Sequence, residues 1–254
     1  MTKKIFTFSL VAAICAMSFF ACRKEKKSTG DLTLNYFPLQ FGKYVTYDVD
    51  STYYIDSNCT RVLIKSQMKY AVTDTFTDKK KRKSYIMDVW TRPYDGAAWK
   101  PSRVIILTPA QTPILNTADP ITTDLLYFQD NAQYVKMRFP VEDGVTWKGN
   151  KYVTVQDSLY SYLRDWDYTY KNTHMSFNNG RVNFDNTVTV IERALNVNDP
   201  YVDSAVNASS TYAKEVYAYN VGMIYREWTH TTYKADTSKC LRGYRVVMRA
   251  VDYN

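Results

Sequence analysis

The stretch RVNFDNTVTVIE, residues 181–192, alternates apolar and polar side chains along most of its length. Successive side chains of an extended chain point to opposite faces, so Val182, Phe184, Val188 and Val190 share one face. Strands also favour β-branched and aromatic residues. The stretch therefore predicts a β-strand with one buried face.

The same alternation recurs along the chain, and helical periodicity is hard to find. The strand-like stretches are 43–50, 61–76, 83–90, 103–108, 134–139, 151–156, 181–192, 212–219, 222–233 and 244–253. Ten or more strands joined by short polar turns predict an all-β, mostly antiparallel fold. Both a curved, barrel-like sheet and a two-layer sandwich satisfy this pattern.

Turn-forming residues lie between these stretches. Asp95-Gly96 and the run Asn178–Gly180 favour hairpin turns. The basic run KKKRK, residues 79–83, predicts a solvated hairpin tip, with contact to anionic lipid as the alternative. The segment 108–120 holds three prolines and no alternation, and we expect a surface loop there.

Two segments resemble each other. Residues 37–51 (FPLQFGKYVTYDVDS) and 139–158 (FPVEDGVTWKGNKYVTVQDS) both read Phe-Pro-aliphatic, then Gly, then an aromatic strand that ends in Asp-Ser. We interpret the likeness as a recurrent turn that starts a strand, and a duplicated lobe is the alternative.

The N-terminus has the pattern of a secretory signal. Lys3 and Lys4 precede 17 uncharged residues, 5–21, which is shorter than the about 20 that a membrane-spanning helix needs. Phe19 is too bulky for ordinary signal peptidase cleavage before Cys22. An uncleaved anchor helix is the alternative.

Ala21 followed by Cys22 resembles the cleavage site of a bacterial lipoprotein signal, with the looser pattern of Bacteroidota-type lipoproteins. The stretches FPLQFGKYVTYDVD, YVKMRFPVEDGVTWKGN and VGMIYREW are similar to spaced motifs of uncharacterised lipoproteins of that type, which have no established activity. The resemblance implies that Cys22 is diacylated and becomes the mature N-terminus. Two or three acyl chains give a stable membrane anchor.

The resemblance divides the chain into a signal peptide (1–21), a lipidated flexible tether (22–33) and a single β domain (34–254). The residues after Cys22 are polar and mostly basic, and too few are apolar to form a core. Lipoproteins exported to the cell surface often carry acidic residues there. We therefore expect an anchor in the outer membrane, with the domain facing the periplasm.

The net charge of +8 does not indicate a nucleic-acid-binding surface. The first 30 residues carry +5 and the KKKRK run another +5, so the rest of the chain carries −2. We expect no nucleic-acid partner.

Cysteine usage predicts one disulfide. If Cys15 leaves with the signal and Cys22 is acylated, Cys59 and Cys240 remain, and two such cysteines pair in an oxidising compartment. Two cysteines and two distant histidines are too few ligands for a metal site, and we expect none.

No motif of an enzyme or of a cofactor site occurs, so we expect neither catalysis nor a cofactor. His174 and His230 are interpreted as surface residues of a loop and a strand. A carboxylate-based hydrolase is the least favoured alternative, and its candidates are Asp48, Asp50, Asp165, Asp167, Glu192 and Glu227. We interpret the aspartates, which lie near tyrosines on alternating strands, as solvent-facing.

The aromatic content is unusual, with 23 Tyr, 11 Phe and 5 Trp. In YSYLRDWDYTY, residues 160–170, the aromatic residues would share one face if the stretch were a single strand: Tyr160, Tyr162, Trp166, Tyr168 and Tyr170. Such a face could bind sugars or a protein partner, and an aromatic core layer is the structural alternative.

These patterns favour a membrane-anchored, non-enzymatic binding module of the cell envelope. Its ligand would be apolar or a glycan, held in a concave cavity lined by aromatic residues. The alternative is a structural or interaction subunit of an envelope complex, which predicts a flat exposed aromatic patch and no pocket.

Overall fold

The computed structural model describes residues 34–55, 59–93, 96–112, 122–154, 158–199, 202, 205–235 and 239–254. Residues 33–254 form one compact unit, separate from residues 1–32. The predicted signal peptide, the acylated Cys22 and the tether to residue 33 lie outside the described residues.

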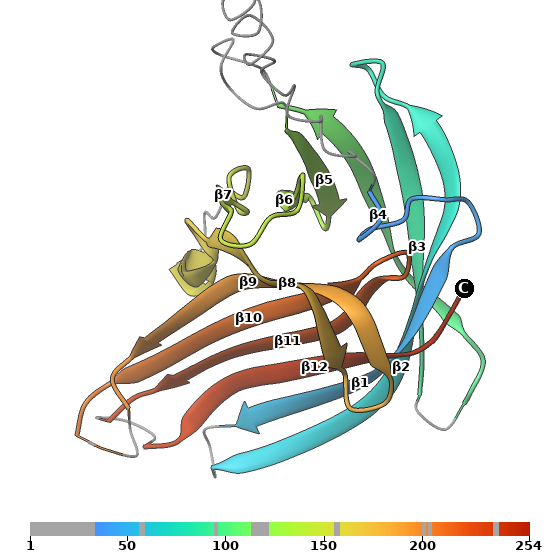
Figure 1. Ribbon diagram of the computed structural model, residues 1–254. Helices are drawn as coiled ribbons and strands as arrows, with labels where there is room; N and C mark the ends of the chain where they lie inside the picture. Colours follow the sequence, from blue (N-terminus) through green and yellow to red (C-terminus); the bar gives the residue numbers. More distant parts are fainter. Residues whose placement is uncertain are drawn as a thin grey trace, which may run out of the picture. The chain divides into compact units, whose positions relative to one another are not determined.

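The described residues form one antiparallel sheet of 12 strands, which confirms the all-β prediction in its curved, barrel-like version (Figure 1). The order across the sheet is β6-β5-β4-β3-β2-β1-β12-β11-β10-β9-β8-β7. The strands are β1 (Tyr44–Ile55), β2 (Thr60–Thr77), β3 (Lys83–Pro93), β4 (Lys100–Gln111), β5 (Thr123–Gln129), β6 (Ala132–Phe139), β7 (Thr146–Lys148), β8 (Asp167–Asn178), β9 (Asn183–Val197), β10 (Ala208–Ala218), β11 (Gly222–Tyr233) and β12 (Leu241–Tyr253).

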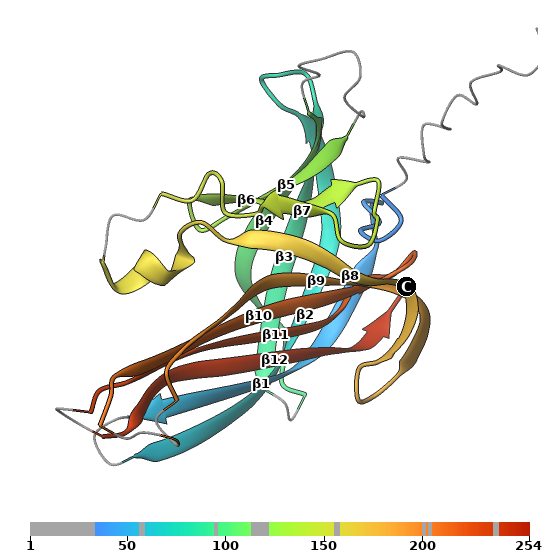
Figure 2. The same cartoon turned by 60° about the vertical axis from the view of Figure 1, so that its left-hand side comes forward.

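The sheet curls until its two edges meet (Figures 1 and 2). Strands β1 and β12 pair in the middle of the order, so the edge strands are β6 and β7. The backbone N–H of Val135 in β6 donates to the carbonyl of Gly149, just after β7, at 2.8 Å, and the indole N–H of Trp147 donates to the carbonyl of Val135 at 2.8 Å. These contacts nearly close the barrel.

The one-faced burial predicted for β9 is found only in part, because Thr187 and Thr189 on its other face are buried too. Val188 and Val190 are fully buried on the concave side of the sheet. The convex side carries ion pairs between neighbouring strands, such as Arg249 with Asp50 at 2.8 Å and Arg245 with Glu227 at 2.7 Å. The concave side therefore holds the core and whatever space the core leaves.

The two turns that start with Phe-Pro are alike at their glycines, although the Phe139-Pro140 bond is cis and the Phe37-Pro38 bond is not. Gly42 and Gly144 have φ of 83° and 80°, a region that favours glycine. The N–H of Gly42 donates to Val72 in β2 at 2.9 Å, and that of Gly144 donates to Tyr170 in β8 at 3.0 Å. The first turn precedes β1 and the second precedes β7, so each begins one half of the 12 strands.

Both local predictions for turns that the structure describes are confirmed. The KKKRK run forms the tip between β2 and β3, and Asn178–Gly180 forms the turn between β8 and β9. The loop predicted for 108–120 is wrong at its start, because β4 continues to Gln111, and residues 113–120 lie outside the described part. The strand predicted for 151–156 is also wrong, since residues 151–154 form a turn and coil.

The predicted disulfide is present. Cys59 and Cys240 are bonded, with their Cα atoms 5.0 Å apart. Cys59 lies in the turn after β1, and Cys240 lies just before β12. The bond therefore joins two hairpin ends at one end of the sheet, across a sequence separation of 181 residues.

Candidate functional site

A cavity of about 910 Å³ lies on the concave side of the sheet. Its volume is within the range of roughly 300–1,000 Å³ that is typical of small-molecule sites. Seven aromatic residues line it: Tyr53, Tyr70, Tyr127, Tyr134, Trp166, Tyr168 and Trp228. Aliphatic and sulfur-containing side chains add apolar wall, and the polar residues include Ser51, Ser66, Gln129 and Asn150.

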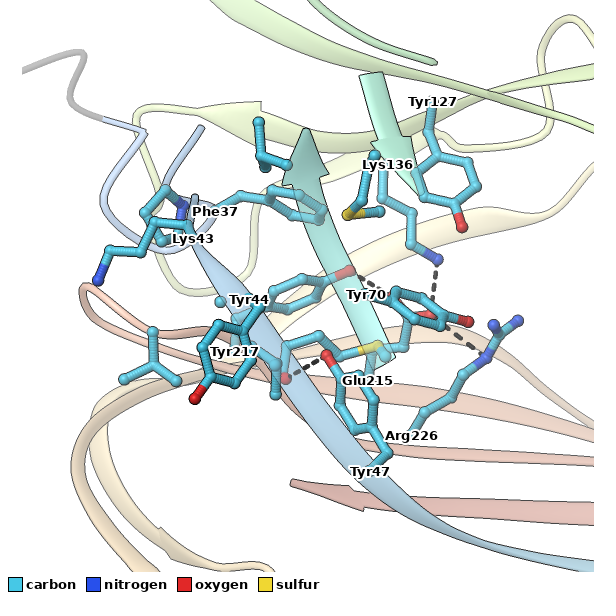
Figure 3. A pocket seen from close by; sticks show the side chains of 17 residues that line it. Phe37, Lys43, Tyr44, Tyr47, Tyr70, Tyr127, Lys136, Glu215, Tyr217 and Arg226 are labelled. Carbon is cyan, nitrogen blue, oxygen red and sulfur yellow. Dashed lines mark hydrogen bonds and ion pairs between the residues drawn. The ribbon is translucent and has the colours of Figure 1, made fainter. Parts of the chain in front are cut away.

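One end of the cavity is formed by a cluster of buried charges. The Nζ of Lys136 in β6 donates to Oε1 of Glu192 in β9 at 2.8 Å and to Oε1 of Glu215 in β10 at 2.6 Å. The Nε of Arg226 in β11 lies 3.4 Å from Oε1 of Glu215. The hydroxyl of Tyr217 donates to the other oxygen of Glu215 (Figure 3). These four strands thus bring two cations and two carboxylates together.

The two carboxyl groups differ in their electrostatic surroundings. Burial raises the pKa of Glu192, and the negative charge of Glu215 raises it further. Burial also raises the pKa of Glu215, but Lys136, Arg226 and the hydrogen bond from Tyr217 outweigh that effect and lower the pKa below its usual value. Glu215 is therefore the more firmly ionised of the two.

Arg226 is fixed by two contacts, and its terminal guanidinium nitrogens remain available as hydrogen-bond donors. Its guanidinium carbon lies 4.9 Å from the ring centre of Trp228, and its Nε contacts Glu215. Within the described part of the chain, its two terminal nitrogens make no hydrogen bond, and its side chain is 20% exposed. The side chain lines the cavity, so these nitrogens can donate to a ligand.

A second, apolar pocket of about 50 Å³ is lined in part by three residues of the charge cluster, Lys136, Glu215 and Arg226 (Figure 3). It shares Tyr70, Tyr127, Lys136 and Arg226 with the large cavity. Phe37, from the segment before β1, lines this pocket and packs on Tyr217 with ring centres 5.7 Å apart. The charge cluster thus borders both the large cavity, which has mixed polarity, and the small apolar pocket. We call the cluster the floor of the large cavity.

The aromatic stretch 160–170 does not form a single strand. Residues Ser158–Leu163 form a 3-10 helix, η2, and β8 begins only at Asp167. The side chain of Tyr160 lies outside the described part. Tyr162 is half-buried, and the three other aromatic residues are buried: Trp166, Tyr168 and Tyr170.

Two members of that stretch nevertheless line the cavity. They are Trp166 and Tyr168, and Trp166 also packs against Trp228 with ring centres 6.2 Å apart. Tyr170 instead lies at the closure of the barrel, where its hydroxyl donates to the carbonyl of Arg138 at 2.9 Å. The three buried aromatic residues thus occupy cavity and core positions, which is closer to the aromatic core layer than to a binding face on a single strand.

The two histidines occupy different surroundings. His230 is stacked on Tyr162 at 3.7 Å between ring centres, and burial lowers its pKa. Its Nδ1 lies 2.9 Å from the hydroxyl of Thr211. His174 is exposed and contacts Tyr36 through Nδ1 at 3.1 Å. Neither histidine lines the cavity.

The solvent-facing interpretation of the aspartates is wrong for Asp48, which is buried, and the candidate carboxylate Glu192 is buried as well. Sequence reasoning also missed Lys136, Glu215 and Arg226. A signal was present in β6 and β10, because Lys136 lies between Val135 and Met137 and Glu215 falls at an apolar position of the alternation Ala213, Glu215, Tyr217.

No group of three or more potential metal ligands occurs among the described residues. In the same part of the chain, no helix is both long and apolar enough to cross a membrane.

Comparisons with known proteins give distant likenesses to solved structures, among them two bacterial proteins. No protein-family profile and no curated protein matches the chain. A proposed exported protein with a YmcC-like fold from Bacteroides fragilis is similar at 17% identity and a TM-score of 0.34, over 85% of this chain and 98% of that one. A proposed lipoprotein from Parabacteroides distasonis is similar at 13% identity and a TM-score of 0.29, with the same coverage. Likeness at this level carries no conclusion about this chain.

Proposed function

We propose that this protein is a lipid-anchored binding module of the cell envelope, which holds an apolar or glycan ligand in its concave cavity. The observation that carries the proposal is the cavity of about 910 Å³ with its aromatic lining. A small domain fills its core, because an unfilled interior costs contacts, so a large space inside the sheet indicates a ligand.

The place of action rests on the N-terminal sequence. The short apolar run, Ala21-Cys22 and the basic residues that follow support a diacylated Cys22. The anchor would lie in the outer membrane, with the β domain on the periplasmic side. A Cys22→Ser variant tests the anchor, because it should remain unprocessed and incorporate no fatty acid; normal maturation would contradict it.

Binding can be tested with the uncharged fluorescent probe N-phenyl-1-naphthylamine. The protein for this test is the chain from residue 22 with Cys22→Ser, which needs no detergent and contains the compact unit 33–254. We expect fluorescence enhancement that saturates, and loss of it in Ser66→Trp, because Ser66 lines the cavity. The matched control is Lys65→Trp, on the opposite face of β2.

Equal enhancement in the Ser66→Trp and Lys65→Trp proteins would contradict binding in the cavity. Circular dichroism of both variants checks that the sheet has folded.

A further inference from the structure

The concave face continues beyond the cavity as an exposed apolar surface. Tyr53 lines the cavity and lies directly opposite Val62 in the pairing of β1 with β2. Ile55 follows on the same face of β1, and Ile64 follows on the same face of β2, opposite Ser51. We call this surface the β1–β2 shelf; its residues are Tyr53, Ile55, Val62 and Ile64.

The shelf is unusually exposed for its composition. The exposed fractions are 44% for Tyr53, 42% for Ile55, 37% for Val62 and 52% for Ile64. The disulfide between Cys59 and Cys240 fixes the hairpin end on which the shelf lies. The shelf is therefore a rigid apolar surface that adjoins the cavity.

Aromatic side chains of β12, η2 and β11 lie beside the shelf. Tyr53 pairs with Tyr244 of β12, whose hydroxyl lies 3.0 Å from the hydroxyl of Tyr162 in η2. Tyr162 is in turn stacked on His230. Leu163, also in η2, lines the cavity. A chain that leaves the cavity over the shelf would thus run between η2 and the β1–β2 hairpin.

The chemistry of the shelf favours an aliphatic chain over a sugar or a protein. Three of its four side chains are Ile or Val, which offer neither hydrogen bonds nor the stacking face that glycan recognition uses; only Tyr53 offers them. Four half-exposed side chains also present much less than the roughly 800 Å² per partner that a stable protein interface buries. A single alkyl chain fits both the composition and the size.

The charges of the cavity favour an uncharged polar group at the other end of the ligand. Each charged side chain that lines the cavity has an opposite charge beside it, as in Arg103 with Asp130 at 3.3 Å. The floor cluster is neutral as well, with Lys136 and Arg226 against Glu192 and Glu215. A charged ligand group would lose its hydration without a counterion, whereas the terminal nitrogens of Arg226 can donate to a neutral acceptor.

We propose, on the basis of the proposed function, that the ligand is an uncharged amphiphile with one aliphatic chain. The chain lies on the β1–β2 shelf, and the polar end accepts hydrogen bonds from Arg226 inside the cavity.

Displacement of N-phenyl-1-naphthylamine by three compounds below their micelle concentrations tests this proposal. They are 1-monododecanoylglycerol (neutral head, one chain), dodecanoate (charged head, same chain) and maltotriose (neutral, no chain). We expect monododecanoylglycerol to displace the probe at about tenfold lower concentration than dodecanoate, and maltotriose not to displace it. Displacement by maltotriose, or tighter binding of dodecanoate, would overturn the proposal while binding itself stood.

Two neighbouring residues of β2 give a matched pair of variants. Ile64 and Leu63 are 52% and 50% exposed, but they lie on opposite faces. We expect Ile64→Ser to weaken binding of monododecanoylglycerol about fivefold, through lost apolar contact, and Leu63→Ser to leave it unchanged. Equal affinities in the two variants would refute the role of the shelf. If the wild-type protein binds no probe, the proposed function fails as well.

Discussion

Lys136 is the residue on which the floor of the cavity depends. Its ammonium group lies 2.8 Å from a carboxylate oxygen of Glu192 and 2.6 Å from one of Glu215, and both carboxylates are buried. The two acids lie on the consecutive strands β9 and β10, 56 and 79 residues beyond Lys136, so Lys136 ties the first half of the sheet to the second. A buried charge that loses its partner is strongly destabilising, although an intact pair contributes little.

We predict that Lys136→Met lowers the free energy of unfolding by about 3–5 kcal/mol, because it leaves two buried carboxylates with only Arg226 nearby. Urea unfolding measures the change. The control is Lys148→Met, whose pair with Asp167 is exposed and about 3.0 Å long, and whose loss should cost less than about 1 kcal/mol. Similar costs in both variants would show that the cluster does not restrain the fold.

The two buried glutamates should respond differently to neutralisation. Because the pKa of Glu215 is lowered, its ionised form stabilises the fold above its unfolded pKa, and this contribution is lost as the pH falls through the folded pKa. The pKa of Glu192 is raised, so its ionised form is less favoured in the fold than in the unfolded chain, and the fold gains stability from this group as the pH falls.

We therefore predict that Glu215→Gln lowers the free energy of unfolding at pH 7 by about 1–3 kcal/mol, and that Glu192→Gln lowers it less. The penalty of Glu215→Gln should shrink as the pH falls below 4.5, the usual value for Glu. Urea titrations at several pH values measure both effects. A larger penalty for Glu192→Gln at pH 7 would contradict these assignments.

Among the elements, the strands were predictable and their ends were less so. β11 was predicted at 222–233 and is found there, because its alternation is bounded by a glycine and a polar turn. β5 was missed because TDLLYFQ is too short and too uniformly apolar to show a clear period, and β7 because it has only three residues. The break between η2 and β8 lies inside an alternating stretch, and no local signal marks it.

The residues that line the cavity could be predicted only in part, because the sequence pattern does not show which strands pair. Alternation assigns a residue to a face, but the pairing of distant strands decides which faces meet. Trp166 and Tyr168 were identified as candidates, whereas the meeting of Lys136 with Glu215, 79 residues away, requires the closed sheet.

The glycines of the two Phe-Pro turns should each contribute to the stability of the fold. Gly42→Ala and Gly144→Ala should each cost about 1–2 kcal/mol, because both positions have left-handed backbone and otherwise meet no obstacle to a Cβ. Urea unfolding of the two single variants checks this. A clear difference between the two costs would contradict the interpretation that both turns impose the same backbone requirement on their glycine.

At the scale of the whole β domain, the disulfide between Cys59 and Cys240 links the turn after the first strand to the last strand. Cys59→Ser with Cys240→Ser should lower the free energy of unfolding by about 2–5 kcal/mol, since the bond joins residues 181 apart. Thiol labelling of the wild-type protein should give no signal before a reductant is added. Labelling without reductant would show that the bond does not form in the purified protein.

The β domain is a barrel-like sheet whose interior is partly empty, with a neutral charge cluster as the floor of its cavity and an apolar shelf at the mouth of that cavity. Each of these features has a structural consequence that stability measurements can test. Their proposed role in binding, however, can be tested only with a bound molecule.

The most direct test is native mass spectrometry of the protein isolated from its own membranes, with any small molecule that accompanies it. We predict that an uncharged amphiphile co-purifies with the wild-type protein and with Lys65→Trp, and is absent from Ser66→Trp, in which the cavity is filled. Recovery of no small molecule, or of equal amounts from the two tryptophan variants, would contradict the central claim that the cavity is a binding site.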